Sequence, residues 1–146
     1  MEDISFAETL KELMEDKAIG VLALAEKIEC NEAAIRRWLY GTYLPDPLTL
    51  IRLADELECS ADYLFGLKYE KDFCRTMQQT TFYQRYAYLR DKEGITDYRV
   101  AKDCGIRDGT LSKWKKIKDF PETDSLLKLA KYFHCSLEYL LGRSNA

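Results

Sequence analysis

Apolar residues recur three and four positions apart along most of the chain, which is the spacing of amphipathic helices. β-branched runs are few, and no alternating stretch is long enough to indicate a strand. The pattern therefore predicts an all-α fold. The expected helices lie near residues 4–16, 21–28, 32–40, 47–57, 61–66, 81–92, 97–104, 108–116, 124–133 and 137–141.

Polar capping residues and prolines mark the ends of these helices. The expected N-caps are Asn31, Ser60, Thr96 and Ser136, whose side chains can accept a hydrogen bond from the first turn. Gly41 is expected to end the helix before it, and Pro45, Pro47 and Pro121 mark loops.

The chain repeats itself with an offset of 76 residues. The phrase "CSADYLFG" at 59–66 returns as "CSLEYLLG" at 135–142, and 14 of the 61 positions aligned at this offset are identical. Two units of about 60 residues, each near the lower size limit of an independent domain, fill the chain. The expected domains are residues 1–67 and 82–146, joined by a polar linker at 68–81.

Composition excludes several classes of protein. No apolar run approaches the length of a membrane span, and no signal-peptide pattern follows Met1, so we expect a soluble cytoplasmic protein. The five cysteines lie singly and only one histidine is present, which argues against a metal site, a cofactor or a disulfide framework. No nucleophile with a nearby base and no phosphate-binding glycine loop occurs, so we do not expect an enzyme.

The second and third helices of each unit have the pattern of a helix-turn-helix. In the first unit the apolar positions expected to be buried are Leu24, Ala25, Ile28, Ile35 and Trp38, and those expected to face outward are Glu32, Ala33, Arg36, Arg37 and Tyr40. In the second unit the corresponding buried set is Val100, Ala101, Cys104, Leu111 and Trp114, and the outward set is Arg107, Asp108, Gly109, Ser112, Lys113 and Lys116. Gly105 supplies a turn residue that tolerates positive φ.

With this motif, the segments "LIRLADELECSADYLFG" and "LLKLAKYFHCSLEYLLG" resemble the Cro and phage-repressor type of helix-turn-helix family, also known as the xenobiotic-response-element type. The resemblance implies two tandem five-helix, lambda-repressor-like domains that bind DNA through their third helices. The chain departs from the family pattern where Val21 and Asp97 replace a common Gln, and where Leu39 and Lys115 replace a common Glu. Ile117 also replaces the glycine that usually ends the third helix.

Charge separates the two halves of the chain. The whole chain has a net charge of −3, but residues 1–69 carry −7 and residues 70–146 carry +4. Because phosphate neutralisation supplies most non-specific affinity for DNA, the second unit is the expected reader. The resemblance implies that Arg107, Gly109, Ser112 and Lys113 face base edges, that Thr110, Lys116 and Lys118 lie nearer the phosphates, and that Arg36 and Arg37, beside the outward Tyr40, are the first unit's contacts.

Other interpretations of these residues remain open. The lysine run could be a solvated helix face, whereas Trp38 and Trp114 are expected in the core and not as base-stacking groups. Tyr83, Tyr86, Tyr88 and Tyr98 could form an interface. Three functions compete: a sequence-specific regulator of transcription, expected to be a repressor; a protein-interaction module, antitoxin-like or in a phage-control complex, whose acidic first unit binds protein; and a helical adaptor. A homodimer is also open.

Overall fold

The computed structural model describes residues 5–68, 80–107, 109–116 and 120–143, and within these ranges the regular structure is helical, with no strand. The chain divides into two compact units, Met1–Arg75 (unit 1) and Thr76–Ala146 (unit 2). The all-α prediction is confirmed. Most of the predicted linker, residues 69–79, lies outside the described residues, and the limits 1–67 and 82–146 stay a prediction.

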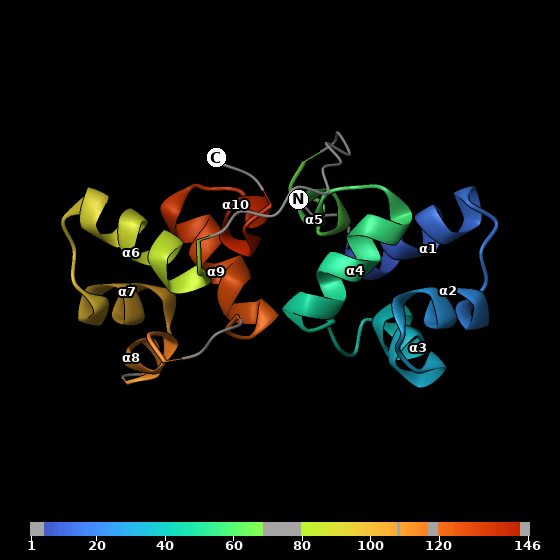
Figure 1. Cartoon of the computed structure of the whole chain (residues 1–146), viewed down its shortest axis with the longest axis horizontal. Coiled ribbons are helices and arrows are strands. Elements are labelled where there is room, and N and C mark those ends of the chain that lie inside the picture. Colours follow the sequence, from blue (N-terminus) through green and yellow to red (C-terminus); the bar gives the residue numbers. More distant parts are fainter. Residues whose placement is uncertain (1–4, 69–79, 108, 117–119, 144–146) are drawn as a thin grey trace. The chain divides into compact units, whose positions relative to one another are not determined.

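The described part of unit 1 forms five helices around one apolar core (Figure 1). They are α1 (Phe6–Asp16), α2 (Val21–Ile28), α3 (Glu32–Tyr40), α4 (Pro47–Leu57) and α5 (Ala61–Leu64). Helix α1 packs against α3 and α5, while α4 packs against α2 and α5. Leu10, Leu24, Ile35 and Leu50 are fully buried where these helices meet. The core therefore holds α3 by its Ile35 side and leaves the opposite side exposed.

Unit 2 repeats the five-helix arrangement with a more aromatic core. Its helices are α6 (Phe82–Glu93), α7 (Asp97–Cys104), α8 (Thr110–Trp114), α9 (Thr123–Phe133) and α10 (Leu137–Leu141). Trp114 makes edge contacts with Phe82 and Tyr86, at centroid distances of 5.4 Å and 5.3 Å. These contacts fix the buried side of α8 against α6.

Side-chain caps define most helix starts. Asn31, Ser60, Thr96 and Ser136 each accept a hydrogen bond from a backbone N–H three residues later, as predicted. Three further caps were not predicted, at Ser5, Asp46 and Thr81. Gly41 ends α3 with a left-handed φ of +79°, as predicted.

A buried arginine joins the first and last helices of unit 2. Arg85 donates from Nε and Nη2 to the carbonyl oxygen of Leu140, at 3.3 Å and 3.0 Å, and from Nη1 to Oγ1 of Thr80 at 2.9 Å. The guanidinium thereby satisfies a carbonyl near the end of α10 that the helix cannot pair itself. Gly142, with φ +82°, lies against this guanidinium and leaves no room for a Cβ atom.

Within the described ranges, Cys30 and Cys104 are free thiols, and no group of three or more His, Cys, Asp or Glu side chains is placed to hold a metal ion. No described helix has the length and apolar character that crossing a lipid bilayer demands.

Candidate nucleic-acid interface

Helices α7 and α8 form the predicted helix-turn-helix of unit 2. Thr96 caps α7, and Gly105 ends it in the left-handed region with φ +68°. Val100 and Leu111 are buried between the two helices and the core. Cys104 is half-buried, whereas the sequence pattern placed it in the core.

Helix α8 is shorter than predicted. The pattern indicated a helix near 108–116, but the described helix covers Thr110–Trp114. Gly109 occupies the N-cap position with φ +88°, a conformation that favours glycine. Gly109 is therefore a turn residue immediately before α8, and its left-handed conformation sets the direction in which the helix begins.

The predicted contact residues of unit 2 surround the outer side of α8. Arg107, Gly109, Ser112, Lys113 and Lys116 are exposed, and Thr110 is half-buried; Lys118 and Asp108 lie outside the described residues. Among the residues that the structure describes, no acidic side chain forms an ion pair with the cations Arg107, Lys113 and Lys116. The outer side of α8 therefore presents positive charge that no described partner neutralises.

A small hollow separates α7 from the start of α8. It has a volume of about 120 Å³ and is lined by Asp97, Tyr98, Ala101, Gly109, Leu111 and Ser112. Ser112 donates from its hydroxyl to the carbonyl oxygen of Gly109 at 2.8 Å, which leaves the oxygen lone pairs able to accept. Tyr98 on α7 is 66% exposed at the edge of this hollow. The sequence pattern places Tyr98 only in an aromatic cluster. Its position in the first turn of α7 is the signal that its side chain can reach the surface beside the start of α8.

Asp97 stands where the family pattern commonly has Gln, and its carboxylate is hydrogen-bonded to other side chains of unit 2. Its Oδ1 accepts from the Tyr86 hydroxyl at 2.6 Å and from Nη1 of Arg90 at 3.0 Å. Burial opposes ionisation of Asp97, but the hydrogen bonds from Tyr86 and Arg90, with the charges of Arg90 and Lys115, outweigh it and lower its pKa. Lys115 also lies 6.0 Å from the ring centroid of Tyr83. This network ties α7 to α6, and the Lys115 ammonium lies over a ring of α6.

A second polar link ties α7 to α9. Asp103 accepts from the Tyr132 hydroxyl at 2.7 Å and from Nε of Arg99 at 2.9 Å. These two hydrogen bonds lower the pKa of Asp103. Both polar links position α7, so the helix-turn-helix is held from two sides.

The equivalent surface of unit 1 has different electrostatics. Arg36, Arg37 and Tyr40 are exposed on α3, with Tyr40 at 83%. Arg36 forms an ion pair with Glu32 at 2.9 Å, and the Arg37 guanidinium lies 5.7 Å from the ring centroid of Tyr43. Each arginine of this surface therefore has an intramolecular partner.

The aromatic residues divide between core and surface. Trp38 and Trp114 are buried, which confirms their predicted place in the core and excludes base stacking. Tyr86 is also fully buried, whereas Tyr88 and Tyr98 are exposed. The four tyrosines of the predicted cluster do not form one exposed patch.

Comparison with known proteins agrees with the geometry of both units. A family model described as "Helix-turn-helix" matches residues 10–64 and 87–140, one segment in each unit. The chain is similar to the HTH-type transcriptional regulator ImmR of Bacillus subtilis (strain 168), with 35% identity over 60 residues. That alignment covers 41% of this chain and 47% of the relative, so the chain matches about half of the relative's length. No solved structure matches the chain.

Proposed function

Because this chain belongs to the helix-turn-helix family, we propose that it is a regulator of transcription that binds double-stranded DNA in a sequence-specific manner. Its expected action is repression, and it needs no catalytic activity of its own. The likeness to a transcriptional regulator over 60 residues supports the proposal.

One observation carries the assignment of the DNA-binding surface. The exposed cations Arg107, Lys113 and Lys116 surround α8 without ion partners among the described residues, whereas Arg36 on α3 is already paired with Glu32. A cation with no intramolecular partner can neutralise a phosphate without first losing an ion pair. Unit 2 is therefore the main reader, and α8 is the element that enters the major groove.

The residues around α8 suit different parts of a duplex. Arg107 and Lys113 can donate to the O6 and N7 atoms of guanine, and the Ser112 hydroxyl can donate or accept at a base edge. Gly109 lets the backbone approach closely because it carries no side chain. Thr110 and Lys116, with Lys118 from outside the described residues, are the proposed phosphate contacts.

A second function has its own support. Unit 1 carries most of the chain's negative charge, and its Arg36 and Arg37 both have intramolecular partners. In this proposal unit 1 binds a protein partner, as in an antitoxin-like or phage-control complex, while unit 2 alone binds DNA. A homodimer in which both units meet adjacent half-sites is the competing arrangement.

Selection from a random duplex pool tests the function. The full chain should enrich a defined sequence, and its affinity should fall steeply between about 50 mM and about 200 mM salt. A single short half-site would support binding by unit 2 alone, whereas two spaced half-sites would support reading by both units or a dimer. No enrichment together with no binding at low salt would refute the proposed function.

A further inference from the structure

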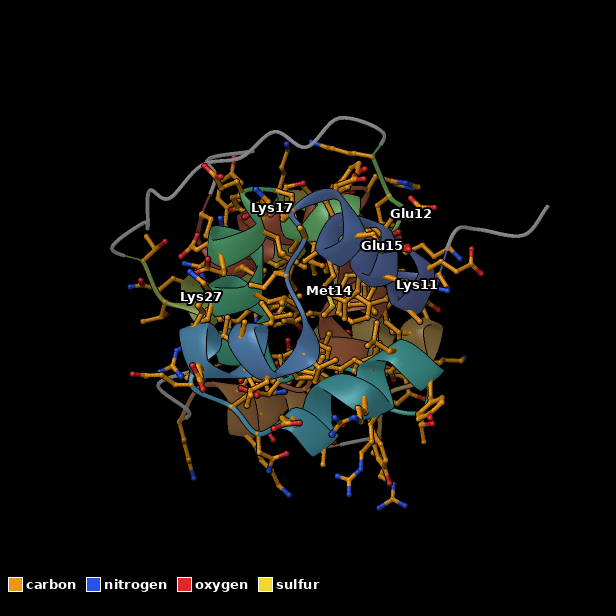
Figure 2. All side chains as sticks on the ribbon, turned by 90° about the vertical axis from the view of Figure 1, so that its right-hand side faces the viewer. Lys11, Glu12, Met14, Glu15, Lys17 and Lys27 are labelled. Atoms are coloured by element: carbon orange, nitrogen blue, oxygen red, sulfur yellow. The ribbon has the colours of Figure 1, made fainter. Side chains whose placement is uncertain are left out.

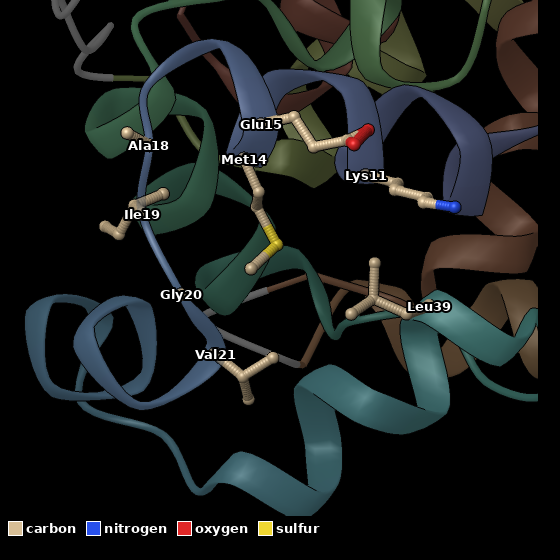
Figure 3. Close-up of a pocket in the computed structure, with 8 residues that line it drawn as sticks. All are labelled: Lys11, Met14, Glu15, Ala18, Ile19, Gly20, Val21 and Leu39. Atoms are coloured by element: carbon tan, nitrogen blue, oxygen red, sulfur yellow. The ribbon is translucent and has the colours of Figure 1, made fainter.

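Unit 1 contains an apolar hollow on the side where α1, α2 and α3 approach one another. The α1–α3 hollow is walled by Met14, Ile19, Val21 and Leu39, with Lys11 and Glu15 at its edge, and has a volume of about 380 Å³. Figure 3 shows Met14 from α1 and Leu39 from α3 extending toward the same space. The hollow is open to solvent, and its lining residues all belong to unit 1.

The internal repeat shows that the apolar lining of this hollow is specific to unit 1. At the offset of 76 residues, five polar residues around Asp97 in unit 2, counting Asp97 itself, correspond to apolar residues in unit 1. The pairs are Ala7 with Tyr83, Leu10 with Tyr86, Met14 with Arg90, Val21 with Asp97, and Leu39 with Lys115.

The two units therefore use the same place differently. In unit 2, Arg90 and Tyr86 hydrogen-bond to Asp97, so the side chains there satisfy one another. In unit 1, Val21 and Leu39 are half-buried and offer apolar surface to the hollow. They also stand at the two positions where the family pattern commonly has Gln and Glu, so both polar side chains are absent from unit 1.

Helix α1, which forms one wall of the hollow, carries an excess of negative charge, although only Glu15 of its carboxylates lines the hollow, beside Lys11. Four carboxylates on α1 are exposed: Glu8, Glu12, Glu15 and Asp16. Within the described part of the chain none of the four forms an ion pair, and the nearby Lys11 has none either. Figure 2 shows Glu12 and Glu15 together at the outer surface of α1. A protein segment that covers both the hollow and the outer side of α1 therefore meets apolar side chains and carboxylates that outnumber the nearby Lys11, so apolar surface combined with positive charge suits it.

These properties select one class of occupant. The carboxylates of α1 repel the phosphates of DNA. A small molecule would stay largely exposed in so open a hollow, whereas typical small-molecule sites bury most of their ligand. We propose that the α1–α3 hollow binds an aliphatic side chain of a lysine- or arginine-rich segment of a partner protein. The proposal rests on the division of work in which unit 1 binds protein and unit 2 binds DNA.

Selection from a displayed library of random peptides, with the full chain as bait, tests this proposal. We expect enriched peptides with one or two Leu, Ile or Val residues flanked by Lys or Arg. On titration with such a peptide, the methyl signals of Met14, Val21 and Leu39 should shift, and binding should weaken as salt rises.

A matched pair of variants separates the hollow from the general charge of unit 1. Val21→Asp places a carboxylate in the wall, as Asp97 does in unit 2, while Leu22→Asp places the same charge on the neighbouring exposed residue, which does not line the hollow. Val21 is the first residue of α2, where a carboxylate is favourable to the helix dipole, so the variant should fold. Val21→Asp should weaken peptide binding about tenfold or more, as loss of a central anchor does, and Leu22→Asp far less.

Measuring duplex binding by the same variants distinguishes failure of the peptide-binding proposal from failure of the proposed DNA-binding function. Val21→Asp should leave DNA affinity nearly unchanged, and loss of peptide binding alone supports the proposal. The proposal is overturned if no peptide is enriched, if the enriched peptides are acidic, or if the methyl signals of the hollow do not move. Sedimentation that shows a dimer abolished by Val21→Asp would also overturn it, because the occupant would then be a second copy of this chain.

Discussion

Replacing the cations of α8 should affect DNA binding more than replacing those of α3. The variants to compare are Lys113→Ala with Lys116→Ala, and Arg36→Ala with Arg37→Ala. Both pairs remove two positive charges from exposed positions, so their effect on net charge is the same. They differ in the partners that the cations have before DNA arrives, since Arg36 is paired with Glu32 at 2.9 Å.

The expected magnitudes follow from the proposed contacts. Losing the phosphate contact of Lys116 should reduce the slope of log affinity against log salt by about 0.9, with the same effect on every sequence. Losing the base contact of Lys113 should cost about 1–3 kcal/mol for the selected sequence and relax the preference at one base pair. An exposed ion pair such as Arg36–Glu32 is worth at most about 1 kcal/mol, so it only partly offsets a new phosphate contact. We expect the arginine pair to change the slope by well under one unit.

Fluorescence anisotropy with labelled duplexes measures both effects. The selected duplex and a scrambled duplex are titrated at several salt concentrations, with each single variant beside each pair. If the arginine pair lowers affinity or slope more than the lysine pair does, α8 is not the main DNA-binding element. If Lys113→Ala weakens binding to the selected and scrambled duplexes equally, Lys113 contacts no base.

Three further predictions concern stability. Gly142→Ala should destabilise unit 2 by more than the roughly 1–2 kcal/mol cost of an alanine in the left-handed conformation, because its Cβ would lie 2.9 Å from the Arg85 guanidinium. Thermal melting should show a smaller loss of stability for Gly41→Ala, whose Cβ would meet no atom within 4 Å. The pKa of Asp97 is lowered in the folded state, so its carboxylate stabilises the protein fully above the pKa of an unfolded-chain aspartate, about 3.9. In urea titrations the stability difference between wild type and Asp97→Asn should shrink as pH falls through the folded-state pKa, and a difference that grows would contradict this. Asn31→Ala should cost about 1 kcal/mol by denaturant unfolding, because Ala34 N–H loses its cap, while Asn31→Ser should retain most of the stability.

Much of the fold follows from local signals in the sequence. The apolar spacing predicts most helices to within two residues, because each helix must bury one face. Asp46 and Thr81 were missed as caps, although Asp46 precedes a proline at the first helical position and Thr81 stands three residues before Gln84. Those local patterns were sufficient to identify both caps.

The features that distinguish the two units depend on contacts between helices. Asp97 meets Tyr86 and Arg90 from another helix, so no local pattern announces the network. The late start of α8 likewise depends on Gly109, whose φ of +88° the sequence permits but does not require. Alignment of the two repeats is the sequence signal that apolar Val21 and Leu39 replace the polar residues found in unit 2. Their effect on the surface depends on the packing of α1 against α3, which the alignment does not show.

Docking of the outer side of α8 on duplex DNA can be observed directly by a backbone amide NMR titration of the full chain with the selected duplex at low salt. We expect the largest shifts at the residues around α8, which are Arg107, Gly109, Thr110, Ser112, Lys113 and Lys116, and much smaller shifts along α3. Shifts concentrated on α3, or a complex that leaves the amides of α8 unmoved, would show that α8 does not dock on the duplex.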